Sequence, residues 1–215
     1  MEGELLVFDV WAPFAYFRKS VTTTTSLTFA IMPRSCIEGL VGAILGFASA
    51  DYPDKLKEAN IALQIINKIN KMPLPLTYTH TDYWSEFGLY LKGKKSKHAK
   101  KKVFSAPARI ELLVDPHYRI YFEHEKLQNS FMDKLSKHET VFTPYLGSSS
   151  MIANFSRGKL CKTKTFLPKE PVSVSSVIPF FKNLPKINAD SEMRCAIEQN
   201  LPIDRKSTRL TSRHT

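Results

Sequence analysis

Residues 5–20 read LLVFDVWAPFAYFRKS. The apolar run from Leu5 to Trp11 predicts a first, buried strand. We expect this strand to end at Ala12-Pro13, because proline has no N–H group to donate to a central ladder. The aromatic residues and cations that follow predict a loop or an edge strand.

Residues 33–50 read PRSCIEGLVGAILGFASA and predict the first helix. Ser35 and Glu38 stand three residues apart as a capping box, so the helix should continue to about Ala50. Three glycines recur in it at helical spacing: Gly39, Gly42 and Gly46. Each lowers helix stability by roughly 1 kcal/mol relative to alanine. We therefore expect either the sheet or a phosphate chain to approach this helix closely.

The rest of the chain shows shorter patterns. A hairpin is the clearest, because two alternating strands, 110–114 and 120–122, flank the turn Asp115-Pro116-His117-Tyr118. The other predicted elements are a strand over 62–69, an amphipathic helix over 125–138, a turn-rich loop over 144–150 and strands over 151–155, 166–174 and 177–181. This order is similar to the split β-α-β arrangement of ferredoxin-like domains, so the expected fold class is α+β.

The composition indicates a globular chain with a polyanionic partner. Of 215 residues, 43% are hydrophobic and 24% are charged, and the formal net charge is +11. The longest apolar stretch, 39–50, is too short for a bilayer, and the N-terminus has no signal-peptide pattern. We therefore expect a cytoplasmic protein without a membrane partner.

Residues 92–102 form the strongest charge block. Seven lysines lie in it with His98 and no acid: Lys92, Lys94, Lys95, Lys97, Lys100, Lys101 and Lys102. Such a block repels itself, so we expect a loop or a hairpin tip that binds an anion. Each phosphate that it neutralises would release a counterion, so binding should weaken as salt rises.

Three separated segments carry a family resemblance: FDVWAPFAYFRKS at 8–20, SLTFAIMPRSCIEGLVGAILG at 26–46 and TPYLGSSSMIANF at 143–155. In this order they resemble the CRISPR-associated Cascade subunit of Cas family five, in the RAMP superfamily, with a pattern most similar to subtype I-B. The resemblance implies a ferredoxin-like (RRM-like) domain with a β-hairpin thumb. It also implies a subunit that binds the 5′ handle of the guide RNA (crRNA) and caps the row of Cascade backbone subunits. That subunit would contact the large Cascade subunit and meet target DNA only indirectly.

On this basis we expect three parts along the chain. Residues 1–140 form the ferredoxin-like domain, with a basic thumb insertion at about 75–108, and residues 141–203 form a small β-rich C-terminal portion. Residues 204–215 read DRKSTRLTSRHT and are similar to a translated sequencing adapter. We interpret them as an artefact without a fold, fused to a truncated reading frame. A natural tail that binds nucleic acid is the alternative.

The resemblance and phosphate chemistry together indicate the RNA-binding candidates. Arg18 follows the first strand, and Arg34 precedes the helix, where a guanidinium and a helix N-terminus both suit a phosphate. A later loop offers backbone N–H and hydroxyl donors from Gly147, Ser148 and Ser149. The candidates in the lysine block are Lys94, Lys95, Lys97, Lys100, Lys101 and Lys102.

Each of the three main candidates also has a structural interpretation. Arg18 could form an ion pair with Glu38 or Asp9 and so stabilise the fold. Arg34 could lie in solvent before the helix, and Gly147 could serve only as a turn residue.

Two other functions stay open, an endoribonuclease and a purely structural scaffold. Some relatives cut precursor guide RNA without a metal, and Lys97, His98 and Tyr90 could supply the cation, the base and the acid. We favour the non-catalytic RNA holder. No metal or cofactor is expected, because the three cysteines form no C-x-x-C pair and the histidines have no acid at metal-binding spacing. The glycine pattern also lacks the Lys-Ser/Thr ending of a phosphate loop.

Overall fold

The body of the protein is built on an antiparallel sheet, which has five strands in the part of the chain that the structure describes. The computed structural model describes residues 2–19, 25–79 and 105–164, and after them 174, 176–178, 198, 201, 204–206 and 209–211. The strands are β1 (Glu2–Trp11), β4 (Asn60–Ile65), β7 (His117–Glu123), β8 (Asn154–Phe155) and β9 (Lys159–Lys164). They run in the order β4-β7-β1, and both β8 and β9 pair with the other edge of β1.

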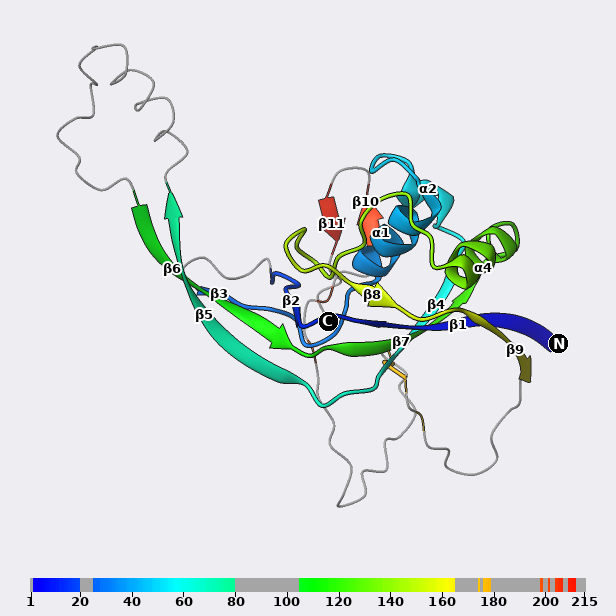
Figure 1. Cartoon of the computed structure of the whole chain (residues 1–215), viewed down its shortest axis with the longest axis horizontal. Coiled ribbons are helices and arrows are strands. Elements are labelled where there is room, and N and C mark those ends of the chain that lie inside the picture. The colour runs from blue at the N-terminus through cyan, green and yellow to red at the C-terminus, as the bar shows by residue number, and fades with distance from the viewer. Residues whose placement is uncertain are drawn as a thin grey trace, which may run out of the picture.

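Helices cover one face of this sheet (Figure 1). They are α1 (Arg34–Leu45), the short α2 (Tyr52–Lys55) and α4 (Gln128–Lys137). Side chains alternate between the two faces of a strand, and Phe8 and Phe122 are buried on the helix side. Phe131 of α4 meets both rings edge-on, with ring centroids 5.2 Å away in each case. No helix in the described ranges is long and apolar enough to cross a bilayer.

A second sheet projects from this body. Its strands are β2 (Phe14–Ala15), β3 (Thr25–Ser26), β5 (Asn70–Thr79) and β6 (Ser105–Val114). β5 and β6 pair antiparallel along their whole length, and we call this pair the arm. Figure 1 shows the arm extending away from the helices. The lysine block lies between the two arm strands in sequence and falls outside the described residues.

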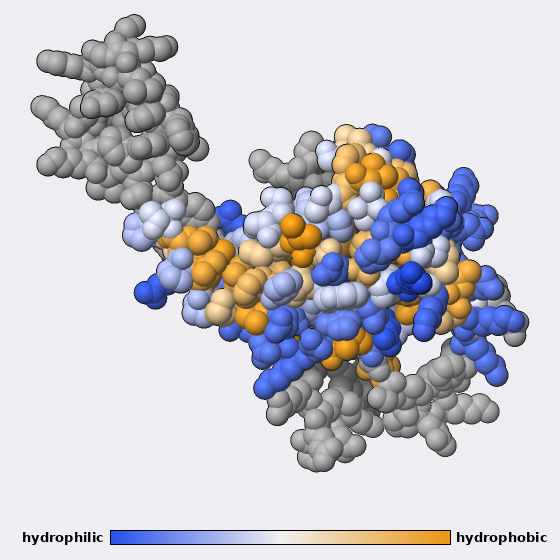
Figure 2. All heavy atoms as spheres, viewed as in Figure 1, coloured by the Kyte–Doolittle hydropathy of each residue, from blue (hydrophilic) through white to orange (hydrophobic). Residues whose placement is uncertain are grey.

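The arm has one apolar side. Leu74 pairs with Ile110 and Met72 pairs with Leu112, so these four side chains share a face. Figure 2 shows apolar residues at the surface along the arm, whereas hydrophilic residues dominate much of the body. Ile110 and Leu112 on this side are buried, whereas Met72 keeps 37% of its surface exposed.

The mixed α/β character, with antiparallel sheets, is confirmed, but the first helix has different ends. α1 ends at Leu45 because Gly46 adopts a left-handed φ of +83°. The predicted capping box is wrong: Pro33 is the N-cap, and no side chain caps the helix. Glu38 instead accepts a hydrogen bond from the Nε of Arg34.

The helix glycines make room for a side chain. Tyr52 of α2 lies over Gly39 and Gly42, and a Cβ built on Gly42 would stand 2.9 Å from the Cβ of Tyr52. The group that approaches the helix is therefore a tyrosine, and neither of the two expected groups, the sheet backbone or a phosphate chain, takes that place.

The predicted hairpin between 110–114 and 120–122 is wrong, although both of its strands exist. β6 belongs to the arm, while β7 pairs with β1 on one side and β4 on the other. Asp115, at φ +47°, donates its N–H to the carbonyl of Pro13 and turns the chain from one sheet into the other. Both edges of β7 are thus occupied, and β6 has no place beside it.

Sequence reasoning missed β9. This strand pairs with β1 from Glu2↔Lys164 to Val7↔Lys159, but its sequence, KLCKTK, has no apolar face and most of it is exposed. β8 and β9 complete the first sheet although they follow the expected boundary at residue 140. The division of the chain into parts stays a prediction.

The C-terminal expectations are only partly covered by the described residues. Most of 166–174 and 177–181 lies outside them, but Ser176 bridges to Gln64 at the free edge of β4. Within 204–215 the structure describes a short pair of strands, β10 (Asp204–Lys206) and β11 (Arg209–Thr211), and the interpretation of this segment as an artefact stays a prediction. A tight hairpin satisfies its backbone groups locally, so it needs no apolar pattern in the sequence.

Candidate nucleic-acid interface

Two of the predicted RNA-binding segments meet at one place, which we call the junction. It consists of Tyr16–Arg18 and the loop Pro144–Ser150. The backbone N–H of Tyr16 donates to the carbonyl of Leu146 over 3.1 Å. Gly147 has φ +85°, and a Cβ built on it would lie 2.0 Å from the carbonyl oxygen of Tyr16. Gly147 is therefore more than a turn residue, because only glycine allows the two backbones to approach this closely.

The loop of the junction is fixed from within. Leu146 is fully buried, and its N–H donates to the carbonyl of Met151. The N–H of Ala153 donates to Pro144, and Met151 donates to Ser148. Among the described residues, the backbone N–H groups of Gly147, Ser148 and Ser149 donate to no protein acceptor. Consecutive backbone N–H groups without a protein acceptor are available to hydrogen-bond an anion.

Arg18 is exposed and stands on a well-anchored strand. Its backbone forms a β-bridge with Thr28, and the N–H of the buried neighbour Phe17 donates to the Thr28 hydroxyl over 2.9 Å. The two carboxylates considered as its partners are engaged elsewhere, Glu38 by Arg34 and Asp9 by Arg119. No carboxylate of the described residues lies within ion-pair distance of Arg18.

Lys19, next in the chain, is already neutralised. Its Nζ lies 2.7 Å from Glu198, and the other oxygen of that carboxylate accepts the N–H of Ala30. Glu198 thereby ties the C-terminal segment to the body of the protein. Of Arg18 and Lys19, Arg18 is therefore the better candidate to bind an external anion.

Arg34 does not lie free in solvent. Its Nε donates to Glu38 over 2.8 Å, and one of its terminal nitrogens donates to the carbonyl of Ala59 over the same distance. These bonds connect the start of α1 to the chain just before β4. Arg34 makes no hydrogen bond to the junction, and its contacts are those of a structural residue.

The remaining predicted site residues fall outside the described part of the chain. They are Lys94, Lys95, Lys97, Lys100, Lys101 and Lys102, together with Tyr90 and His98 of the nuclease alternative. Within the described ranges, no group of three His, Cys, Asp or Glu side chains could hold a metal ion.

Sequence reasoning missed a polar cluster on the sheet face opposite the helices. Arg119 of β7 donates two hydrogen bonds to Asp9 of β1, over 2.7 and 3.0 Å, and His117 lies 3.6 Å from the same carboxylate. Hydrogen bonds from Arg119 hold the pKa of the Asp9 carboxyl below its ordinary value of 3.8, against the opposing effect of burial. The predicted pairing of 120–122 with 110–114 concealed the pair, because Asp9 lies opposite Arg119 only in the observed pairing of β1 with β7.

We predict that Asp9→Asn lowers stability by about 1 kcal/mol at neutral pH, since two charge-assisted bonds are lost at a partly exposed site. A carboxyl with a depressed folded-state pKa contributes stability above its ordinary pKa and loses it as pH falls through the folded value. The wild type should therefore lose this contribution below about pH 4, whereas Asp9→Asn lacks it throughout. Urea unfolding at a series of pH values measures the difference, with Asp133→Asn as the exposed control. If the free energy of unfolding changed with pH equally in the wild type and in Asp9→Asn, this prediction would be contradicted.

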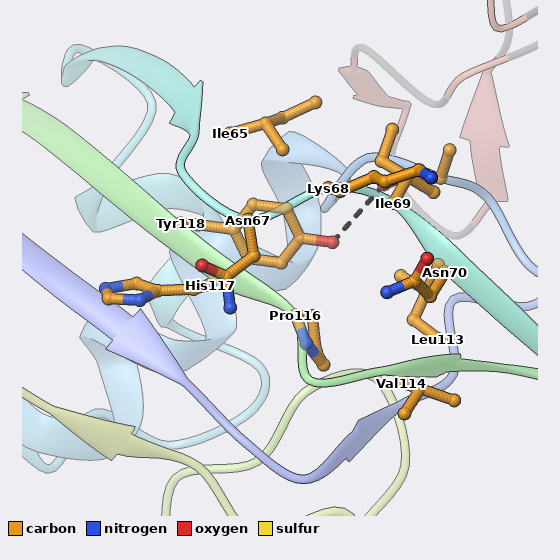
Figure 3. Close-up of a pocket in the computed structure, with 11 residues that line it drawn as sticks. Ile65, Asn67, Lys68, Ile69, Asn70, Leu113, Val114, Pro116, His117 and Tyr118 are labelled. Carbon is orange, nitrogen blue, oxygen red and sulfur yellow. Dashed lines mark hydrogen bonds between the residues drawn. The ribbon is translucent and has the colours of Figure 1, made fainter.

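A small cavity lies where the two sheets meet (Figure 3). The hydroxyl of Tyr118 donates across it to the carbonyl of Ala30 over 3.3 Å, and burial raises the pKa of this phenol. The cavity measures about 10 Å³, which is room for no more than a water molecule. It is a structural joint between the body and the arm, and a nucleotide does not fit it.

The two sheets and the helices together define a mixed α/β protein, and comparison places it in a family. The family model described as CRISPR-associated protein (Cas_Cas5) matches residues 5–195, so the chain belongs to the family of CRISPR-associated Cas5 proteins. The resemblance noted in the sequence is thereby confirmed at the level of the family. No curated protein sequence matches significantly.

Comparison with solved structures finds a similar fold in one case and weaker matches in others. A chain of a CRISPR RNA-guided surveillance complex has a TM-score of 0.52 and 16% identity, with 69% of this chain and 60% of that chain covered. A crystal structure of a Cas protein has a TM-score of 0.44 and 16% identity, with 68% of this chain and 57% of that chain covered. A CRISPR protein from Archaeoglobus fulgidus has a TM-score of 0.36 and 15% identity, with 75% of this chain and 65% of that chain covered. This chain thus spans about three fifths of the length of the first two of these proteins.

Proposed function

We propose that this chain is the subunit of a type I CRISPR effector complex, of the I-B-like subtype, that binds the 5′ handle of the guide RNA. The junction carries the proposal. There Arg18, which has no ion-pair partner among the described residues, lies two residues after Tyr16, whose N–H bonds to the loop that carries the N–H groups of Gly147, Ser148 and Ser149. A phosphate of the RNA backbone satisfies both, because guanidinium and N–H donors each form charge-assisted hydrogen bonds with it.

The topology supports the ferredoxin-like interpretation. The succession β1-α1-β4-β7-α4-β9, with the strands in the order β4-β7-β1-β9, is that of a split β-α-β domain. The arm is inserted between β4 and β7, and we propose that it is the base of the thumb. The lysine block would then lie at the thumb tip, where it adds affinity for phosphates without choosing bases.

The partners follow from this proposal. The subunit would cap the row of backbone subunits, contact the large subunit and meet target DNA only indirectly, in the cytoplasm. We propose a non-catalytic role, in which the junction holds RNA and Lys97, His98 and Tyr90 do not cut it. Cleavage of repeat RNA by the purified chain without metal, abolished by His98→Ala, would establish the nuclease alternative.

Replacement of Arg18 tests the phosphate contact. We expect Arg18→Ala to weaken binding of an RNA with the repeat-derived 5′ end about tenfold or more, because charge-assisted hydrogen bonds to the phosphate are lost. The slope of log affinity against log salt should fall by about 0.7, the value for one phosphate contact on a single strand. Fluorescence anisotropy over a salt series measures both quantities.

Lys137→Ala is the matched control for Arg18→Ala. Lys137 is an exposed cation on α4 that pairs with Asp133, away from the junction. Lys137→Ala should leave the RNA affinity and its salt slope nearly unchanged. Equal effects of the two replacements would show that Arg18 contributes only to the general charge, and would contradict the proposed site.

A further inference from the structure

From β2 to the isolated bridge at Arg18, the side chains of the junction alternate between buried and more exposed positions. Along residues 14–18, Ala15 and Phe17 are buried, whereas Phe14 keeps 38% of its surface exposed and Arg18 is exposed. In an extended chain every second side chain lies on the same face. Phe14, Tyr16 and Arg18 therefore share the outward face of this strand.

The loop of the junction extends this face. The bond from Tyr16 to Leu146 holds the two stretches side by side, and Leu146 is buried in the same core as Phe17. Tyr145, which precedes Leu146, is on the solvent side of the loop. Tyr145 is 46% exposed, and Ile152, bridged to it, is 58% exposed. We call the three rings of Phe14, Tyr16 and Tyr145, together with the neighbouring aliphatic side chain of Ile152, the aromatic face.

The two exposed rings stand on fixed backbone. Phe14 is paired with Val114 in the ladder of β2 and β6, and Tyr145 is paired with Ile152. Neither ring is needed to fill the core, which is occupied on this side by Ala15, Phe17 and Leu146. A partly exposed aromatic ring on an ordered backbone loses little conformational freedom when a flat ligand packs on it.

We propose that Phe14 and Tyr145 stack with unpaired bases of single-stranded RNA whose backbone phosphate is held by Arg18 and the loop N–H groups. This inference rests on the proposed function. The position beside a free cation favours RNA as the occupant, because stacking rings next to a phosphate-binding group is the arrangement by which proteins hold single strands. Every base has a stacking face, so the aromatic face holds the strand without requiring a particular base.

Affinity for a fluorescein-labelled twelve-nucleotide oligoadenylate, measured with the full chain, tests the inference. Phe14→Ala and Tyr145→Ala should each weaken binding about fivefold or more, the usual effect of losing one stacked base. Their salt slopes should equal that of the wild type, because no phosphate contact is lost. Tyr145→Phe, which keeps the ring, should bind as the wild type does. An abasic oligomer with the same phosphates should not distinguish Tyr145→Ala from wild type.

Phe142→Ala is the control for loss of an exposed ring. Phe142 is 51% exposed, and its backbone bonds to Ala43 at the end of α1, away from β2. It should leave RNA affinity unchanged. Thermal unfolding midpoints close to wild type should show that all variants fold, because each replaced ring is at the surface.

The outcomes separate the two proposals. If Arg18→Ala weakens binding and neither ring replacement does, stacking is overturned while the phosphate site stands. If Arg18→Ala has no effect on binding of the RNA with the repeat-derived 5′ end, the proposed function fails and the aromatic face fails with it. If that RNA binds but oligoadenylate does not, stacking without base preference is overturned while the phosphate site stands. If the ring variants bind RNA normally but no longer assemble with the other subunits, the occupant is a protein and the inference is overturned.

Discussion

Gly147→Ala should destabilise the protein by about 3 kcal/mol or more, an unusually large effect for the addition of one methyl group. At φ +85° an alanine is strained, and its Cβ would overlap the carbonyl oxygen of Tyr16. The overlapping atom belongs to the backbone, so it cannot be relieved by a rotamer change. The loop must leave the strand or the strand must move, and RNA binding at the junction should be lost with it.

Urea unfolding and RNA affinity measure this prediction together. Ser149→Ala, in the same loop but exposed, is the control and should unfold like the wild type. Gly46→Ala is an informative comparison, because Gly46 also has a left-handed φ but its neighbour is the exposed side chain of Val141, which can move. Gly46→Ala should therefore have the smaller effect. A wild-type midpoint for Gly147→Ala would show that the two backbones do not meet as described.

Phe131→Ala should destabilise the protein by about 3 to 5 kcal/mol, the usual range for removing a buried phenylalanine. Phe131 is fully buried and contacts Phe8 and Phe122 edge-on, so its removal leaves a cavity between α4 and the sheet and breaks two aromatic contacts. Differential scanning calorimetry measures the loss. Phe131→Leu should recover most of it, and Phe142→Ala, at the surface, should have little effect. A small loss for Phe131→Ala would mean that α4 does not pack on this sheet.

Elements with a strong apolar pattern could be predicted from the sequence. β1 and α4 each carry a buried stripe, and the apolar segment of α1 does the same, so their existence follows from hydrophobic periodicity alone. The pairing of strands could not be predicted in this way. Asp115-Pro116 has the composition of a hairpin turn, yet its neighbours are chosen by which edges are free in the assembled sheets. β9 was missed because an edge strand bonded through its backbone needs no apolar face.

The candidate site was predicted in part. Arg18 and Gly147 were identified as candidates, but the contact between their segments depends on a backbone approach that no sequence pattern reveals. Arg34 was a candidate because a cation before a helix suits a phosphate; in the structure it bonds to Glu38 and Ala59, and its contact with RNA stays a prediction. A sequence shows which cations exist, whereas the fold determines which of them already have partners.

Protection of the guide RNA in the assembled complex tests the central claim most directly. The complex would be purified with wild-type chain or with Arg18→Ala, treated with a single-strand-specific nuclease, and the 5′ ends of the bound guides sequenced. We expect the wild type to protect the 5′ handle and Arg18→Ala to leave it open to cleavage, with the rest of the guide protected in both. Identical protection of the 5′ handle in the two complexes would contradict the account.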